Sequence, residues 1–385
     1  MHNTQTKKNI PELRFPEFEG EWEEKKLGEV TSFYSGLTYS PNVVREKGTF
    51  VIRSSNIKNN RLVTADDVFV EKDKVNSEKV NLGDVIVVVR NGSRNLIGKH
   101  ARVNKEINDA VIGAFMTGLR YKYSKFLTAL LDTENFKKEI YKNLGATINQ
   151  ITTGTFKNML FKFPIEAEQQ KIGTFFSKLD QQIELAENKV SFLHEQKKGY
   201  MQKIFSQQLR FKDENGNDYP EWEEKKLGDT YEVQMGQSPS SKNYSENTND
   251  TILVQGNADL KKGRVFPRVY TKELTKIAKK DEMILTVRAP VGELGFAQYD
   301  VCIGRGVCSI NGDRFLYTFL EYFKINNKWY QYSQGSTFES VSGNEIRNIK
   351  VPKPLKYEQQ KIGAFFSKLD QHIELAEQKV EQLKE

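Results

Sequence analysis

An internal repeat constrains this chain more than any other feature of its sequence. Residues 168–190 read EQQKIGTFFSKLDQQIELAENKV and residues 358–380 read EQQKIGAFFSKLDQHIELAEQKV, so that 20 of 23 positions are identical. The segment EWEEKKLG also occurs twice, at residues 21–28 and 221–228. Self-similarity of this length and order indicates a duplicated structural unit. The chain of 385 residues is therefore expected to contain two copies of one plan.

The two copies agree at their ends and differ in the middle. Gly36 in the first copy matches Gly236 in the second, and VIGAF at 111–115 resembles CIGRG at 302–306, but most residues between the matched ends differ. Two related modules that read two different targets would show this pattern. Neutral drift in the middle of an old duplication is the alternative interpretation.

The repeated segment predicts a long helix in each copy. Its apolar residues alternate at spacings of three and four, interrupted only by Lys197, which is the pattern of a helix packed against another helix. The first helix is expected from Glu168 to about Gln208, a length of roughly 60 Å. The residues assigned to helix packing and subunit assembly are Phe176, Leu179, Ile183, Val190, Phe366, Leu369, Ile373 and Val380.

The variable middles combine strands with short helices. Runs of β-branched residues between clusters of Gly, Asn, Asp and Lys predict strands. These runs occupy residues 49–53, 85–89, 251–255 and 283–287, and helices are expected at 125–144 and 313–333. The resulting order is an α+β globule, a long helix, a second globule and a second long helix.

Composition narrows the class of protein. The chain has 58 basic and 51 acidic residues, a net charge of +7, which favours a polyanionic partner. No stretch approaches the roughly 18 to 20 apolar residues of a membrane span, and we expect a cytoplasmic protein without membrane contact. Cys302 and Cys308 are too few for a disulfide framework and lack zinc-site spacing, so both are expected to be buried strand residues.

The repeated motifs resemble a known family. A G-[AS]-T-[IF] motif at 145–148 and 335–338 precedes the pattern P-x-x-x-EQQKI-x-x-FFSKLDQ-x-I in both copies. This arrangement resembles the DNA-specificity (S) subunit of type I restriction-modification systems over nearly the whole chain. The resemblance implies an α+β fold in which two long antiparallel coiled-coil helices separate two α/β target-recognition domains, with a pseudo-two-fold internal repeat.

The resemblance also implies a domain organisation. The triplet Leu13, Arg14, Phe15 recurs at 209–211, directly after the first long helix, so the N-terminal segment supplies what should follow the second helix. We therefore expect an N-terminal segment at 1–19 that completes the distal conserved region, recognition domains at 20–165 and 220–355, a central conserved helical region at 166–219 and a distal one at 356–385.

The function implied by the resemblance is DNA recognition without catalysis. Such a subunit binds double-stranded DNA, reads a bipartite target, and docks two methyltransferase subunits and, through them, two restriction subunits. S-adenosylmethionine, ATP and Mg then belong to the partners, and no cofactor, metal or catalytic residue is expected in this chain. A coiled-coil scaffold that binds proteins is the alternative. A self-sufficient nucleic-acid enzyme is disfavoured because no N/D-P-P-Y/F methyltransferase motif and no complete P-loop occur.

Candidate DNA contacts gather in the loops that follow the predicted strands. Phosphate contacts require Lys or Arg, and base reading requires Arg, Asn, Gln, Ser or Thr. The alternative is that these residues are ordinary solvated loop residues without a DNA contact. Trp22 and Trp222 are predicted to anchor the core rather than to stack on bases. The candidates are Arg53, Ser54, Ser55, Asn56, Arg90, Asn91, Ser93, Arg94 and Lys99 in the first copy, and Gln255, Asn257, Lys261, Lys262, Arg264, Arg288 and Arg305 in the second.

Overall fold

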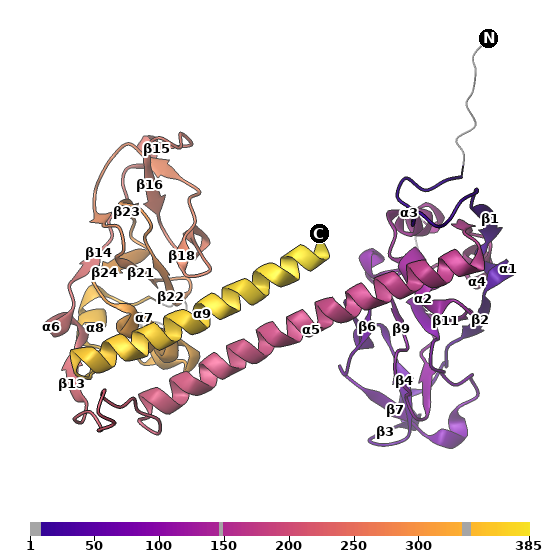
Figure 1. The fold of residues 1–385 in the computed structure, drawn as a ribbon, viewed down its shortest axis with the longest axis horizontal. Helices are drawn as coiled ribbons and strands as arrows, with labels where there is room; N and C mark the ends of the chain where they lie inside the picture. Colours follow the sequence, from indigo (N-terminus) through magenta and orange to yellow (C-terminus); the bar gives the residue numbers. More distant parts are fainter. Residues whose placement is uncertain (1–8, 146–148, 333–339) are drawn as a thin grey trace, which may run out of the picture. The chain divides into compact units, whose positions relative to one another are not determined.

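The chain divides into two compact units in a computed structural model that describes residues 9–145, 149–332 and 340–385 (Figure 1). Unit 1 extends to Ile183 and unit 2 begins at Glu184, so the boundary falls inside the long helix α5 (Glu166–Phe205). Residues 146–148 of the first G-[AS]-T-[IF] motif, and all of the second motif, lie outside the described residues.

Unit 1 contains two four-stranded sheets and two strand pairs. The sheets have the strand orders β10-β4-β7-β3 and β2-β11-β8-β9, and the pairs are β1-β12 and β5-β6. The strands are β1 (Glu23–Lys26), β2 (Ser32–Ser35), β3 (Val44–Arg45), β4 (Thr49–Ile52), β5 (Ile57–Lys58), β6 (Arg61–Leu62), β7 (Val68–Val70), β8 (Val85–Val88), β9 (His100–Arg102), β10 (Ala110–Ile112), β11 (Met116–Arg120) and β12 (Leu160–Phe163). The helices are α1 (Leu27–Val30), α2 (Ser124–Leu131), α3 (Glu134–Asn143) and α4 (Thr153–Lys157), with 3-10 turns η1 (Pro41–Val43), η2 (Ser54–Asn56), η3 (Lys72–Lys74) and η4 (Arg94–Leu96).

Unit 2 repeats this plan with larger sheets. A six-stranded sheet has the order β14-β24-β21-β22-β18-β17, a five-stranded sheet has the order β15-β19-β16-β23-β20, and β13 pairs with β25. The strands are β13 (Glu223–Lys226), β14 (Val233–Met235), β15 (Tyr244–Ser245), β16 (Thr251–Val254), β17 (Leu260–Lys261), β18 (Arg264–Val265), β19 (Tyr270–Thr271), β20 (Ile277–Ala278), β21 (Met283–Val287), β22 (Val291–Phe296), β23 (Val301–Ile303), β24 (Val307–Ile310) and β25 (Lys350–Lys353). The helices are α6 (Leu227–Thr230), α7 (Arg314–Ile325), α8 (Gly343–Asn348) and α9 (Lys356–Lys384), with 3-10 turns η5 (Ser241–Asn243), η6 (Asn257–Asp259) and η7 (Lys328–Gln331).

The β-branched runs form strands, as predicted, and β8 and β21 lie in the cores of unit 1 and unit 2. The run at 85–89 contains β8 and the run at 283–287 is β21; every residue of both strands is buried. A short continuous apolar run between turn residues is typical of a strand covered on both faces. Cys302 in β23 and Cys308 in β24 are also buried, and burial raises the pKa of the Cys308 thiol to about 12.

The helix predicted at 125–144 is two helices instead of one. The Thr133 side chain accepts a hydrogen bond from the Phe136 amide at 3.2 Å and thereby starts α3 just after α2 ends. A residue that caps a new helix interrupts the preceding one. In unit 2 the helix predicted at 313–333 is also interrupted. Asn327 has a left-handed φ of 53°, which a right-handed helix cannot continue through, so α7 ends before it and only the short η7 follows.

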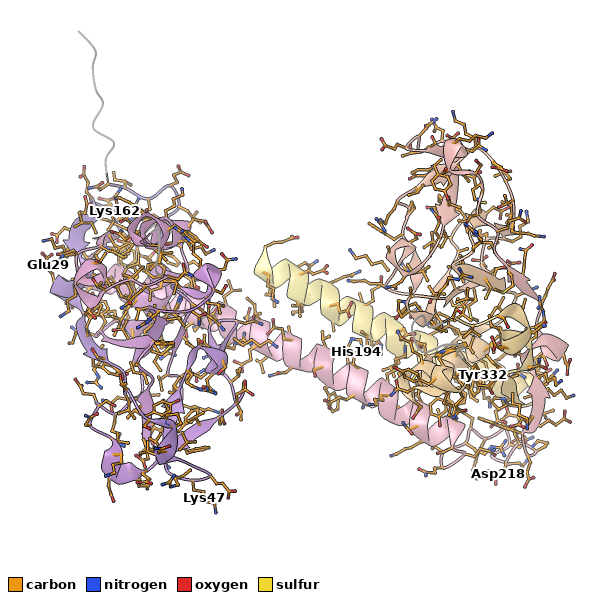
Figure 2. All side chains as sticks on the ribbon, turned by 180° about the vertical axis from the view of Figure 1, so that it is seen from behind. Glu29, Lys47, Lys162, His194, Asp218 and Tyr332 are labelled. Atoms are coloured by element: carbon orange, nitrogen blue, oxygen red, sulfur yellow. The ribbon has the colours of Figure 1, made fainter. Side chains whose placement is uncertain are left out.

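The long helices α5 and α9 pack antiparallel within unit 2, where Figure 1 shows them side by side. The rings of Tyr200 and Phe365 lie 5.1 Å apart. Further toward the start of α5, His194 (Figure 2) lies 3.4 Å from Glu377 of α9. Because residue numbers rise along one helix as they fall along the other, the two helices run in opposite directions.

Lys197 interrupts the apolar stripe because it lies in a half-buried ion cluster. Its Nζ lies 2.7 Å from a carboxylate oxygen of Glu321 in α7 and 2.7 Å from one of Asp370 in α9. Asp370 also pairs with Arg314. Burial raises the pKa of Glu321, which the neighbouring Lys197 opposes. The cluster therefore connects α5, α7 and α9 at the point where an apolar residue was expected.

The first turn of each long helix carries a buried glutamate that is held by an arginine and a tryptophan. Glu168 accepts hydrogen bonds from Arg14 at 2.7 and 2.9 Å and from the Trp22 indole at 3.3 Å. In unit 2 the corresponding bonds run to Glu358, from Arg210 at 2.8 and 3.2 Å and from Trp222 at 2.9 Å. Both glutamates are fully buried. Arg14 of the N-terminal triplet therefore occupies in unit 1 the place that Arg210 occupies in unit 2. Trp222 also packs against the cluster around Phe366, as predicted for a core anchor.

The apolar stripe has different surroundings in the two repeats. In α9, Phe366, Leu369 and Ile373 are buried in one cluster that includes Met201 and Ile204 of α5. In the first half of α5, Phe176 is 45% exposed and Leu179 is only half-buried. Val190, Ile183 and Val380 are also half-buried.

Candidate nucleic-acid interface

Four strand ends meet at one edge of unit 1. β4 and β10 are parallel, so their carboxyl ends lie at the same edge. β8 and β2 are both antiparallel to β11, and their last residues lie opposite its first residues, which begin at Met116. The loops that leave β2, β4 and β8, together with the turn from β10 to β11, therefore converge. We call these four segments the strand-exit edge.

A cavity of about 640 Å³ opens at the strand-exit edge of unit 1. Predicted contact residues Arg53, Ser54, Ser55 and Asn91 line it together with Phe115. Arg90 stacks its guanidinium 5.0 Å from the Phe115 ring centre. The structure thus brings together three segments that are separate in the sequence, at 53–55, 90–91 and 115.

Internal hydrogen bonds fix the shape of this edge. The Asn91 side-chain amide donates to the Ser54 hydroxyl at 3.2 Å, and the Lys99 ammonium donates to the Ser54 carbonyl at 3.0 Å. Burial lowers the pKa of Lys99. Arg53 donates to the Asp66 carbonyl, whereas its Nε is buried and has no hydrogen-bond partner among the described residues. Ser93 and Arg94 are exposed beside this group.

Unit 2 has the same edge. β16 and β23 are parallel, and the Gly304 amide donates to the Val254 carbonyl at 2.8 Å, as the Gly113 amide donates to Ile52 in unit 1 at 2.9 Å. The loop after β16 carries Gln255 and Asn257, the loop after β21 begins with Arg288, and the turn after β23 carries Arg305. The Ser238 hydroxyl accepts from the Arg305 amide at 3.0 Å and holds that turn in place.

The two edges share a backbone frame and differ in side chains. Equivalent positions follow from the matched hydrogen bonds, and the residue after β4 or β16 is Arg53 or Gln255. In the turn after β10 or β23, Ala114 corresponds to Arg305, and Phe115 corresponds to Gly306. The first two exchanges, Arg53 for Gln255 and Ala114 for Arg305, change the chemistry of the side chain, and the third removes an aromatic ring altogether.

Gly36 and Gly236 make the frame possible. A Cβ atom on Gly36 would lie 1.9 Å from the Gly113 carbonyl oxygen, and one on Gly236 would lie 2.1 Å from that of Gly304. Both distances are far below van der Waals contact, and the obstacle is backbone that cannot rotate away. This explains why the two copies keep a glycine at this position.

Replacing Gly236 with alanine should therefore destabilise unit 2. Forcing an extra methyl group into close-packed backbone typically costs about 1–3 kcal/mol. The matched control is Gly256→Ala, because Gly256 has extended backbone and a Cβ atom added to it would meet no atom within 4 Å. Urea denaturation of both variants measures the difference, and equal midpoints would contradict the close approach.

The prediction that Asn56 contacts DNA is corrected by the structure. Asn56 is 1% exposed, and its side chain accepts from the Arg53 amide at 2.9 Å and donates to Asp67 at 2.8 Å. Asp259 holds the same place in unit 2 and accepts from the Gln255 amide at 2.8 Å. Asn56 therefore positions the loop, because its polar atoms are already used inside the unit.

Three basic candidates lie on a hairpin near the long helices, and two of them are engaged with α9. Lys262 lies 3.3 Å from Glu377 and 3.4 Å from Glu381, and Arg264 lies 3.3 Å from Glu374, all on α9. Lys261 on the same hairpin is exposed, with its ammonium 5.3 Å from the Phe266 ring centre. The candidates of unit 2 therefore fall into two groups. One group lies on the β17–β18 hairpin that contacts α9, and the other, Gln255, Arg288 and Arg305, lies on the strand-exit edge.

Phe115 and Ser238 are site residues that sequence reasoning did not single out. A signal existed for the first, because VIGAF and CIGRG align and differ at the two positions that follow their shared glycine. Within the described ranges, no group of three or more His, Cys, Asp or Glu side chains is placed to hold a metal ion. No described helix is both long enough and apolar enough to cross a membrane.

Comparison with known proteins agrees with this architecture. The family described as "Type I restriction modification DNA specificity domain" matches residues 19–192 and 219–385. The putative type I restriction enzyme MjaX specificity subunit of Methanocaldococcus jannaschii is 26% identical, over 97% of this chain and 93% of that protein. The StySPI specificity subunit of Salmonella potsdam is 30% identical over 41% of this chain and 37% of that protein.

Solved structures show the same fold. The type I restriction-modification S subunit from M. genitalium superposes with a TM-score of 0.64 at 17% identity, covering 94% of this chain and 93% of that one. A chain from a type I R-M system, described in a study of complex assembly, superposes with a TM-score of 0.53 at 21% identity, over 94% of both chains. With its two family matches, its two α/β units and its long antiparallel helices, this chain belongs to the family of type I restriction-modification DNA specificity subunits.

Proposed function

We propose that this chain selects the DNA sequence for a type I restriction-modification complex, with each strand-exit edge reading one half of a bipartite target. The observation that carries the proposal is the shared frame with exchanged side chains: Arg53 against Gln255, and Ala114 against Arg305. Arginine pairs best with guanine and glutamine with adenine in the major groove, so such exchanges alter which base is accepted.

The chain acts as a non-catalytic subunit in this proposal. It docks two methyltransferase subunits and, through them, two restriction subunits, and the partners hold S-adenosylmethionine, ATP and Mg. The long helices, whose exposed faces carry many charged residues, provide the docking surface. The complex binds DNA in the cytoplasm. The excess of 58 basic over 51 acidic residues suits a subunit that approaches phosphates.

The proposal predicts that mutations at the two edges act on separate half-sites. Arg53→Ala with Arg90→Ala should relax or abolish recognition of one half, and Gln255→Ala with Arg288→Ala should do so for the other. Each lost bidentate base contact costs about 1–3 kcal/mol of discrimination. Methylome sequencing of a strain that expresses each variant with the cognate methyltransferase measures both half-sites at once.

Lys47→Ala is the matched control. Lys47 precedes β4 and so lies at the other end of that strand from Arg53 (Figure 2). It is basic and exposed, and its loss should leave both half-sites unchanged. A uniform loss of methylation at all sequences in both double variants would assign these residues to phosphate contact. A complex that methylates without any sequence preference would instead favour the protein-binding scaffold.

A further inference from the structure

Phe115 is held in an exposed position at the strand-exit edge of unit 1. The residue is 52% exposed and lines the cavity there. Its carbonyl oxygen accepts hydrogen bonds from the Val89 amide at 3.0 Å and the Arg90 amide at 3.2 Å, which fix its backbone. The Arg90 guanidinium lies 5.0 Å from the ring centre, a cation–π distance. The ring is thus presented on a rigid turn.

The fold that units 1 and 2 share does not require an aromatic residue at this position. The equivalent residue in unit 2 is Gly306, where a Cβ atom would lie 1.9 Å from the Gln255 carbonyl oxygen. The same turn is therefore built once without any side chain and once with a large exposed one. Because Phe115 is mostly outside the core, its packing gives no sufficient reason for its presence.

The surroundings of the ring combine apolar and donor groups. Leu37, Ala114 and Met116 line the same cavity, and so do Arg53 and Asn91. Of the four bases, only thymine presents a methyl group beside a carbonyl acceptor in the major groove. An apolar ring next to amide and guanidinium donors is complementary to that edge. Cytosine would offer a donor and no methyl group, and would be rejected.

We propose that Phe115 is a specificity-determining residue of unit 1 that contacts the C5 methyl group of a thymine in the half-site read by this unit. The inference rests on the proposed function and adds the chemical group that is read. Arg90 positions the ring and remains available to a neighbouring acceptor or phosphate. Unit 2 has no such contact, since Gly306 leaves no room for a side chain.

The test removes the methyl group and the ring separately. The chain is assembled with its methyltransferase, and binding is measured to duplexes of the methylome-defined target in which single thymines are replaced by deoxyuridine. In the wild-type complex, one replacement in the half-site of unit 1 should weaken binding about fourfold, the value of one buried methyl group. In Phe115→Ala the same replacement should have no effect, whereas Phe115→Leu should keep part of it.

Tyr299→Ala removes another exposed aromatic ring of the chain, one that lies outside the edge, and should leave the thymine-to-deoxyuridine ratio at its wild-type value. The proposal is overturned if no deoxyuridine in that half-site weakens the wild-type complex, or if the half-site has no A·T pair. It is also overturned if the effects of Phe115→Ala and deoxyuridine multiply, since the ring would then act by stacking or by supporting the loop. Failure of the proposed function is distinguishable, because the unmodified duplex would then bind no better than an unrelated one.

Discussion

Glu358→Ala is expected to lower the free energy of unfolding of unit 2 by about 3–5 kcal/mol. The substitution leaves Arg210 as an unpaired cation with 18% of its side chain exposed, and removes the acceptor of the Trp222 indole. Breaking a buried ion pair from one side has this effect, because the remaining charge keeps its desolvation penalty. Urea denaturation followed by tryptophan fluorescence measures the change directly, since Trp222 lies at the site.

Two comparisons isolate burial as the cause. Glu224 pairs with Lys350 at 2.8 Å on the surface of the same unit, and Glu224→Ala should leave the unfolding midpoint nearly unchanged. Glu358→Gln keeps the shape and an acceptor for Trp222 but loses the charge, and should fall between the other two variants. If Glu224→Ala and Glu358→Ala shifted the midpoint equally, the buried position of Glu358 would be wrong.

Phe366→Ala and Phe176→Ala should differ strongly although the two residues occupy the same sequence motif. Phe366 is fully buried among Met201, Ile204 and Phe315, and its truncation should cost about 3–5 kcal/mol. Phe176 is 45% exposed, and its truncation should cost about 1 kcal/mol or less. Thermal and urea unfolding of both variants provide the comparison.

The two phenylalanine variants control for each other. Both residues lie in the sequence FFSKLDQ, so that the substitution changes the local helix propensity equally in the two. Equal destabilisation by the two substitutions would mean that Phe176 is covered to the same extent as Phe366. Leu369→Asp extends the test along α9: Leu369 is 8% exposed, and a charge there should prevent packing against α5. Leu179→Asp, at the half-buried equivalent position, should be tolerated better in the isolated chain.

Much of the fold followed from local patterns in the sequence. The repeat established two copies of one plan, since such identity needs no tertiary information to be recognised. The β-branched runs located β4, β8, β16 and β21 because short, mostly apolar runs between turn residues are typical of buried strands. The alternating apolar stripe located α5 and α9, and the strand exits pointed to Arg53, Asn91 and Gln255.

The tertiary structure decided how residues with similar local sequence are used. Asn56 resembles a base-reading residue in its loop, but its side chain is buried and hydrogen-bonded to Arg53 and Asp67. Lys197 breaks the stripe because Glu321 and Asp370, distant in the chain, meet it there. Neither pairing leaves a periodic signal, since Asn56 bonds within its own loop and the partners of Lys197 lie on α7 and α9.

The sequence by itself therefore determined the repeat, the two long helices, the strands β4, β8, β16 and β21, and the loops that carry variable side chains. Only the tertiary structure decided that Phe366 is buried and Phe176 is exposed, and that Phe115 stands beside Arg90 in a cavity while Gly306 cannot hold a side chain. The physical reason is that secondary structure depends on neighbours along the chain, whereas burial and hydrogen bonding depend on groups that come together only when the strands and helices pack.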